Sequence, residues 1–299
     1  KENSAIRERV EFYVKGEKVV GNLYRPADLK VGKKYPAVIV GGSWTTVKEM
    51  MAGNYAEKLG KEGFVALTID HRGYGESEGA IRDFEDPSMK EQDFKGAISF
   101  MASIDFVDSE RINLVGVCAS AGYMSKVAYQ DERVNSFVSV AGWLHKPETV
   151  ELIYGGKEGV DKLLQLSNDA KEVYNSTGEV KHVLACSDTD PSAAMFGPFE
   201  YYLDENRGKI KEWGNRFALM AWEGWLTFNP IKTANLIKVP VFMIHSEEAA
   251  LPQGAREFYE SVEGNKYIFW TSGNQLDFYD NEEKINEAIE KIVTFLKDN

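Results

Sequence analysis

The sequence predicts an α/β protein with a mostly parallel sheet that is covered by helices on both faces. Short apolar segments typical of strands alternate with segments of helical periodicity along most of the 299 residues. Residues 112–122 read as an apolar strand, a turn of small residues and the start of a helix. Hydrophobic residues make up 43% of the chain, enough for one large domain or two smaller ones.

The predicted elements follow one another in a regular order. Residues 10–14 and 19–23 flank Lys15-Gly16-Glu17 and are expected to form an antiparallel hairpin. Further strands are expected at residues 36–40, 64–69, 112–116, 134–140, 239–244 and 267–270. Helices are expected at residues 47–61, 90–104, 120–129, 254–262 and 281–297. The last helix has one apolar stripe, formed by Ile285, Ile289, Ile292, Val293 and Leu296.

One segment interrupts this order. Residues 144–234 contain no convincing core strand but several helical patterns, and many aromatic side chains fall within residues 201–228. We therefore expect a core formed by residues 1–143 and 235–299, with residues 144–234 inserted as a helical cap. Because ligands of open α/β sheets bind at the carboxyl ends of the strands, a cap there would build an apolar substrate pocket. The aromatic side chains would also hold the cap together.

The turn of small residues within 114–122 carries the main candidate for chemistry. The layout is that of a nucleophile elbow, in which a reactive side chain stands on a strained strand-to-helix turn between small residues. Two registers fit the usual Gly-x-Ser-x-Gly pattern, one centred on Cys118 and one on Ser120. Gly116 directly follows the apolar strand, which favours Cys118 as the nucleophile. The alternative is that Cys118 is a buried structural cysteine.

Composition limits the partners that this chain can have. Its net charge of −12 argues against nucleic acid or an anionic membrane surface. No run of apolar residues is long enough for a transmembrane helix, and two cysteines are too few for a disulfide scaffold. We expect a soluble protein and prefer a cytoplasmic location; because the chain begins at Lys1, a removed leader also fits. No group of Cys, His and carboxylate residues has metal-ligand spacing, so no metal or cofactor is expected.

The order of these elements resembles the α/β-hydrolase fold. The cysteine elbow resembles that of dienelactone hydrolase and its relatives. Four segments are similar to a capped bacterial and fungal branch that includes hydrolases and polyketide acyltransferases: GSWTTVKE (42–49), DHRGYGES (70–77), GVCASAGY (116–123) and DFYD (277–280).

The resemblance implies an oxyanion hole made of backbone amides. The fold supplies one amide from the residue after the nucleophile and one from the loop after the third strand. In this chain these are the amide of Ala119 and that of Ser43 or Trp44. Because Cys118 stands at a helix N-terminus, we also expect its thiol to have a lowered pKa.

The histidine that the family places before its final Asp-x-Tyr-Asp segment is missing, and Gln275 occupies its position. Glutamine cannot accept and return a proton at neutral pH, so a standard triad through this position is excluded. We expect the Gln275 amide to face the Cys118 pocket and to orient substrate or water. The alternative is that it only fixes its own loop. We assign the acidic partner to Glu247 and, as a second choice, to Glu248. The alternative is that Glu247 is a solvated carboxylate at a strand end.

Four histidines are present, and three follow the carboxyl ends of predicted strands. His145 is the candidate replacement base, because its strand should neighbour the elbow strand; the alternative is a hydrogen bond in the cap hinge. We expect the other three to be structural, with His71 organising its loop through Arg72 and Ser77, His245 buried near Glu247, and His182 within the cap.

The sequence therefore predicts a hydrolase that acts on an ester, lactone or thioester with an apolar part, through Cys118 and a non-standard or incomplete triad. Two alternatives stay open. One is an acyltransferase of the same fold, in which a substrate hydroxyl replaces water. The other is a protein that has lost hydrolysis and binds a small apolar ligand beneath its cap. The sequence identifies neither the substrate nor the oligomeric state.

Overall fold

The computed structural model describes residues 4–299 and is organised around one eight-stranded sheet. The strands lie in the order β1-β2-β4-β3-β5-β6-β11-β12. The first three pair antiparallel and all the others parallel, which confirms the predicted α/β class. The strands are β1 (Ala5–Val14), β2 (Glu17–Pro26), β3 (Tyr35–Gly41), β4 (Val65–Ile69), β5 (Val107–Val117), β6 (Val134–Val140), β11 (Val241–Ser246) and β12 (Lys266–Thr271).

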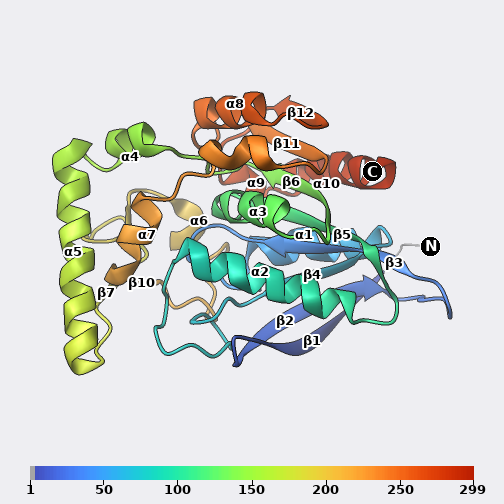
Figure 1. The fold of residues 1–299 in the computed structure, drawn as a ribbon, viewed down its shortest axis with the longest axis horizontal. Helices are drawn as coiled ribbons and strands as arrows, with labels where there is room; N and C mark the ends of the chain where they lie inside the picture. The colour runs from blue at the N-terminus through green and yellow to red at the C-terminus, as the bar shows by residue number, and fades with distance from the viewer. Residues whose placement is uncertain (1–3) are drawn as a thin grey trace.

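Helices cover both faces of this sheet (Figure 1). Helices α1 and α10 contact each other on one face, and α2 and α3 contact each other on the other. Every residue of β4 is buried, as expected of a parallel strand covered on both sides. The helices of this part of the chain are α1 (Met51–Lys61), α2 (Pro87–Ala102), α3 (Ala119–Gln130), α8 (Pro252–Ser261), α9 (Asp277–Asp280) and α10 (Glu282–Asp298).

Helices α1 and α2 begin farther from their predicted first residues than the other predicted helices do. Helix α1 begins at Met51 rather than at residue 47 because side chains from elsewhere hold the preceding backbone. The amide of Thr45 donates to Glu85 at 2.5 Å, and that of Lys48 donates to Asp70 at 2.9 Å. Helix α2 begins three residues before the predicted Lys90, since Asp86 caps it and Pro87 occupies its first turn.

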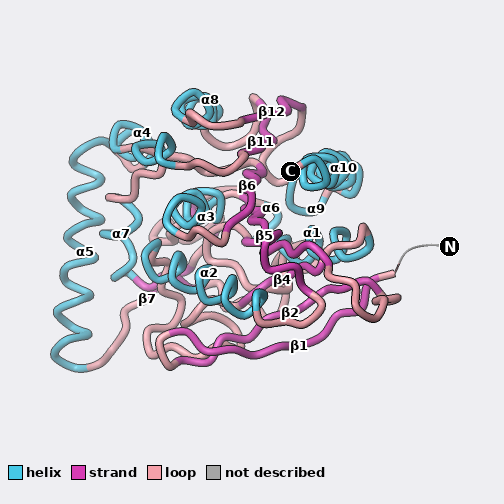
Figure 2. Tube along the Cα trace, turned by 45° about the vertical axis from the view of Figure 1, so that its right-hand side comes forward, coloured by secondary structure: helices cyan, strands magenta, loops and turns pink. Residues whose placement is uncertain are grey.

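Residues 141–240, here called the inserted segment, join β6 to β11 and form no strand of the main sheet. As expected, it contributes no core strand, but the helical pattern did not reveal the short strands that pair within it as two separate two-stranded sheets. Figures 1 and 2 show α5 standing apart at the end of the molecule opposite the chain termini. Across residues 4–299, no helix is both long and apolar enough to span a membrane. The elements of the inserted segment are α4 (Pro147–Ile153), α5 (Gly156–Thr177), β7 (His182–Leu184), β8 (Cys186–Ser187), β9 (Met195–Phe196), α6 (Glu200–Leu203), β10 (Arg216–Ala218), η1 (Leu219–Ala221), α7 (Trp222–Leu226) and η2 (Ile231–Leu236).

Aromatic rings fasten the inserted segment to the core. The ring of Trp44, in the loop after β3, lies 4.8 Å from that of Phe217, 5.7 Å from Trp222 and 5.2 Å from Trp225. The indole N–H of Trp213 donates to the carbonyl of Thr45 at 2.9 Å. The aromatic residues noted in the sequence therefore bind the inserted segment to the loop beside Cys118.

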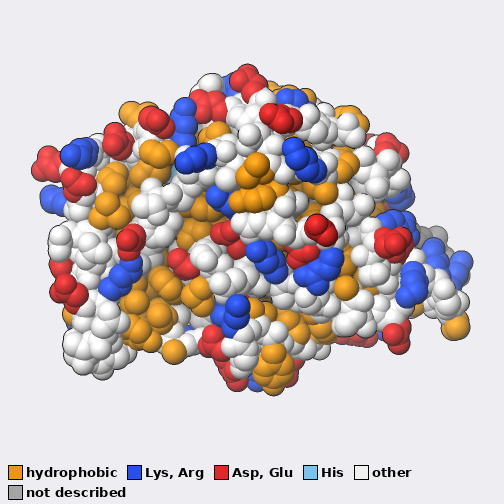
Figure 3. All heavy atoms as spheres, viewed as in Figure 1, with side chains coloured by type: hydrophobic (Ala, Val, Ile, Leu, Met, Phe, Trp, Pro, Cys, Tyr) orange, Lys and Arg blue, Asp and Glu red, His pale blue; other side chains and the backbone are white. Residues whose placement is uncertain are grey.

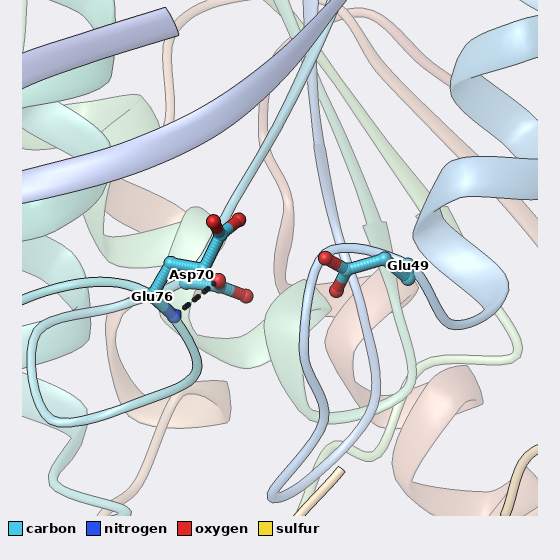
Figure 4. Close-up of side chains that lie close together, drawn as sticks. All are labelled: Glu49, Asp70 and Glu76. Carbon is cyan, nitrogen blue, oxygen red and sulfur yellow. Dashed lines mark hydrogen bonds between the residues drawn. The ribbon is translucent and has the colours of Figure 1, made fainter. Parts of the chain in front are cut away.

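A cluster of charges lies under the same loop. Oxygen atoms of Glu49, Asp70 and Glu76 lie within 4.8 Å of one another, a spacing compatible with a metal ion (Figure 4). The ammonium of Lys48 nevertheless donates to all three, at 2.8, 2.7 and 2.5 Å respectively. This lysine is nearly fully buried and supplies the positive charge that these carboxylates need. The cluster is therefore an ion-pair network that fixes the loop after β3.

We predict that Lys48→Met lowers the free energy of unfolding by about 3–5 kcal/mol, because it leaves the buried charge of Asp70 without its cation. Chemical denaturation measures this change. The matched control is Lys58→Met, which removes a surface pair with Glu282 and should cost less than about 1 kcal/mol. Equal losses in the two variants would contradict a structural role for the buried network.

Candidate active site

Cys118 stands on a strained turn between β5 and α3. It has φ 57° and ψ −117°, a conformation that residues with a side chain rarely adopt. A Cβ at Gly116 would lie 2.6 Å from the amide nitrogen of Ala121, so glycine is required there. Ser120 lies inside the helix, where its hydroxyl donates to the carbonyl of Gly42 at 2.5 Å. The structure thus places Cys118 at the turn and Ser120 in a supporting position.

Hydrogen-bond donors surround the sulfur of Cys118. The backbone amides of Ala119 and Trp44 and the Tyr279 hydroxyl lie near it, and the Gln275 amide, whose two N–H groups have other acceptors, is also close enough to favour the thiolate. The sequence left Ser43 and Trp44 as alternatives for the second backbone amide. The structure distinguishes them, because the amide of Ser43 instead contacts the sulfur of Met51 at 3.4 Å.

Burial dominates the acidity of Cys118. The side chain is 6% exposed, and loss of hydration raises the pKa of the thiol to about 11. The four donors each favour the thiolate, but together they do not offset burial. The expectation of a lowered pKa was therefore wrong. A helix N-terminus is visible in the sequence, whereas the apolar surroundings that oppose it come from residues far apart in the chain, in the core and in the inserted segment.

A cavity of about 570 Å³ opens above Cys118. The core and the inserted segment both line it, and most of the lining is apolar. Ile153, Phe196 and Phe199 lie in this lining and remain exposed. Figure 3 shows hydrophobic side chains gathered beside α5, over α4 and α7. The described lining residues are Trp44, Cys118, Ala119, Trp143, Ile153, Tyr154, Ala194, Met195, Phe196, Phe199, Tyr202, Trp225, Glu248, Ala249, Ala250, Gln275, Leu276 and Tyr279.

Gln275 faces the sulfur of Cys118 from the loop after β12. Its oxygen accepts from the amide of Ala250 at 2.8 Å, and its nitrogen donates to the carbonyl of Ala141 at 2.9 Å. The same nitrogen donates to the hydroxyl of Tyr279 at 3.2 Å. Both ends of the amide are thus engaged, which fixes its orientation. Gln275 therefore holds its loop, as the alternative expected, and it also lines the cavity. That it orients substrate or water stays a prediction.

The acid assigned from the sequence lies away from the site. Glu247 is exposed and forms an ion pair with Arg256 at the surface. It does not lie behind the Gln275 loop, so its assignment as the acidic partner was wrong. The alternative, a solvated carboxylate at a strand end, describes Glu247 instead. Glu248 lines the cavity with an exposed carboxylate. Its neighbours in the lining are uncharged.

His145 does not reach Cys118, which corrects its assignment as the replacement base. It is fully buried in the hinge of the inserted segment, where the indole of Trp143 donates to its Nδ1 at 3.1 Å. Its ring packs edge-on against Trp225, with the centroids 4.6 Å apart. Burial lowers the pKa of His145 to about 4, so it is neutral at physiological pH. The alternative stated for His145, a hydrogen bond in the hinge, therefore agrees with the structure.

The remaining histidines have structural partners. His71 bonds Asp93 at 3.1 Å, and Asp93 also holds Arg72, a partner that the sequence did not indicate. His245 bonds the carbonyl of Ala250 at 2.8 Å rather than Glu247. His182 bonds the carbonyl of Arg82 at 2.8 Å. All four histidines of the chain lie in the described residues, and none hydrogen-bonds the sulfur of Cys118.

Sequence reasoning missed two tyrosines beside Cys118. Tyr279 is 2% exposed, and its hydroxyl lies near enough to the sulfur to favour the thiolate. Tyr202, from α6, packs against Tyr279, and its hydroxyl lies 2.6 Å from the hydroxyl oxygen of Ser43. The signal for Tyr279 was the DFYD segment (277–280), which was noted only as a likeness. Nothing in the sequence places Tyr202 there, since it lies in the inserted segment.

The strand order and the strained turn after β5 define an α/β hydrolase. A crystal structure of the α/β hydrolase GrgF from Penicillium sp. sh18 has the same fold, with a TM-score of 0.80. That chain is 18% identical, and the match covers 98% of both chains. The model of the X-Pro dipeptidyl-peptidase (S15) family matches residues 15–275. The chain belongs to this family.

Two relatives illustrate the range of proteins to which this chain is similar. The chain is 24% identical over 292 residues to the uncharacterized protein YcjY of Escherichia coli strain K12, covering 92% of each. It is 24% identical over 259 residues to the acyltransferase drtE of Aspergillus calidoustus, covering 81% of this chain and 80% of that one. Likeness at this level leaves the reaction of this chain to be argued from its own site.

We predict that iodoacetamide alkylates Cys118 faster than Cys186, because Cys118 lines the cavity whereas Cys186 is 1% exposed within β8. Since burial raises the pKa of the Cys118 thiol to about 11, its alkylation rate should rise roughly tenfold per pH unit from about pH 6 to pH 9. Peptide mapping by mass spectrometry at each pH measures both rates. A plateau below pH 8, or earlier labelling of Cys186, would contradict this account.

His145→Gln should change the pH dependence of stability. The unfolded state binds a proton at about pH 6.5, whereas the folded pKa is about 4, so stability falls as pH drops through this interval. Removing the imidazole should recover up to about 3 kcal/mol of that acid-side loss. Thermal melts between these pH values measure the effect, with the partly buried His182→Gln as the control. Loss of acyl-transfer turnover without loss of folding would restore His145 as a candidate base.

Proposed function

We propose that this protein is a cysteine-dependent acyl-transfer enzyme of the hydrolase class, acting on an ester, lactone or thioester whose acyl part is apolar. Cys118 is the nucleophile. The amides of Trp44 and Ala119 form the oxyanion hole, and residues 144–234 form the cap. The observation that supports this most directly is that both amides reach the sulfur of a cysteine on a strained turn.

The sulfur and the two amides are arranged for attack on a carbonyl carbon. When the Cys118 sulfur bonds that carbon, the carbonyl oxygen gains negative charge. Amide N–H groups that are already aimed at this place stabilise the charge without reorganisation, and more strongly in a dry cavity than in water. The cavity of about 570 Å³ has room for a small molecule, and its apolar lining suits an apolar acyl group.

None of the four histidines hydrogen-bonds the Cys118 sulfur, and this limits the leaving groups that the proposed reaction can expel. An alkoxide or an amine must be protonated as it departs, a task that an imidazole usually performs. A thiolate is a weaker base and departs without prior protonation. Within the proposed class we therefore favour thioesters over alkyl esters. The same argument weighs against peptide hydrolysis, despite the dipeptidyl-peptidase description of the family.

Transfer to an acceptor other than water is a second form of the same reaction. Water needs a base to attack the acyl-enzyme, and Gln275 does not provide one. The likeness to the acyltransferase drtE supports this form. The non-catalytic alternative, binding of a small apolar ligand, is favoured by one observation, namely that burial raises the pKa of Cys118 to about 11.

The test uses two matched substrates, the octanoyl thioester of N-acetylcysteamine and ethyl octanoate. We expect turnover of the thioester and an octanoyl adduct on the Cys118 peptide in mass spectrometry. The thioester should exceed the ester in kcat/KM by about 10²- to 10⁴-fold, the usual value of general acid–base help. Cys118→Ala should abolish turnover and adduct, whereas Cys186→Ala should leave both unchanged.

Two results would overturn the proposal. Turnover that survives in Cys118→Ala would show that another group performs the reaction. Saturable binding of an apolar acyl compound with neither turnover nor adduct would favour the ligand-binding alternative.

A further inference from the structure

The hydroxyl of Tyr279 lies where a proton must move during acyl transfer. Tyr279 belongs to α9, the four-residue helix that directly follows Gln275. Its hydroxyl lies near enough to the sulfur of Cys118 to favour the thiolate, and both side chains line the same cavity. It therefore contacts the reacting atom from the side on which a substrate would lie.

Gln275 fixes the direction of the Tyr279 hydroxyl proton. The Gln275 nitrogen donates to the Tyr279 oxygen, and the bonds to Ala250 and Ala141 prevent the amide from turning over. Because the tyrosine oxygen already accepts from Gln275, its own proton points elsewhere. Glutamine at this position, which cannot itself exchange protons, thus directs a group that can.

A second phenol continues the chain of hydroxyl groups. The Tyr202 hydroxyl lies beside that of Tyr279, and it lies 2.6 Å from the Ser43 oxygen. Both tyrosines and Ser43 are nearly fully buried. Burial raises the pKa of both phenols well above the ordinary value, so each carries its proton at neutral pH. Tyr279 is therefore a donor in the resting site.

We propose that Tyr279 is a catalytic residue that relays the proton between the Cys118 sulfur and the substrate. This inference rests on the proposed acyl transfer. During acylation, the bond from sulfur to the carbonyl carbon forms and the bond from that carbon to the leaving heteroatom breaks. The thiol proton passes to the Tyr279 oxygen, while the phenol proton passes to the leaving sulfur, so the phenol is regenerated in the same step. Because burial makes this phenol a much weaker acid than an imidazolium, it does not serve an alkoxide well, and the preference for thioesters stands.

The second half of the reaction runs through the same atoms in reverse. The incoming acceptor bonds the carbonyl carbon and gives its proton to the Tyr279 oxygen. The bond from carbon to the Cys118 sulfur breaks, and the phenol proton passes to that sulfur. No charged phenolate is required at any point, which suits a tyrosine whose pKa is raised by burial.

The test is Tyr279→Phe, which removes the hydroxyl and keeps the ring. We expect turnover of the octanoyl thioester to fall by about 10²- to 10⁴-fold. Alkylation of Cys118 at neutral pH should also slow, because the thiolate loses one donor. The control is Tyr201→Phe, in which the lost hydroxyl bonded the backbone of Met51 rather than the sulfur. This control should keep the parent rates.

A replacement that preserves shape covers the case in which Tyr279→Phe does not fold. With 3-fluorotyrosine at position 279 the phenol is more acidic and its oxygen is less basic, so kcat for the thioester should change while the ring keeps its place. A purely structural hydroxyl would leave kcat unchanged.

The outcomes separate this inference from the proposed function. Cys118→Ala should be inactive in either case. Parent-like turnover in Tyr279→Phe, or an unchanged kcat with 3-fluorotyrosine, would then overturn the relay and leave the proposed function standing. Turnover that survives in Cys118→Ala would overturn both.

Discussion

The hydrogen bonds of the Gln275 amide hold together the strand ends that form the site. Gln275 follows β12, and its partners Ala141 and Ala250 follow β6 and β11. A third bond aligns Tyr279. An imidazole has two nitrogens, so a histidine at 275 would forgo at least one of these bonds. With Glu247 paired at the surface, such a histidine would also lack the acid of a triad. The glutamine is thus the centre of a different arrangement, in which orientation replaces proton exchange.

Burial and hydrogen bonding oppose each other at Cys118. Two backbone amides, a phenol and a carboxamide favour the thiolate, yet the loss of hydration keeps the resting group a thiol. In the proposed reaction, attack on a carbonyl must therefore coincide with removal of the thiol proton, unlike in an enzyme whose cysteine is already ionised. The same dry surroundings would strengthen the proposed oxyanion hole once charge develops on a substrate. Under this proposal, the apolar lining of the cavity suppresses the resting thiolate and favours the transition state.

Periodicity and turn chemistry were enough to predict the main sheet, its covering helices and the strained turn at Cys118. These features depend on local residue types and on the spacing of apolar residues, both of which can be read from the sequence. Contacts between side chains at the sheet edge also depend on the direction in which each side chain points. His145 follows β6 as expected, but the indole of Trp143 takes its Nδ1 and only Trp143 lines the cavity. The Lys48 network and the approach of Tyr202 join residues that are far apart in sequence, and no spacing rule indicates them.

The most direct test of the central claim is a crystal structure of the protein after reaction with the octanoyl thioester. The account predicts an octanoyl group on the Cys118 sulfur, with its chain in the apolar cavity. Its carbonyl oxygen should lie about 2.7–3.1 Å from the amide nitrogens of both Trp44 and Ala119. An intact thioester beside an unmodified sulfur, or an acyl group on any other residue, would contradict it.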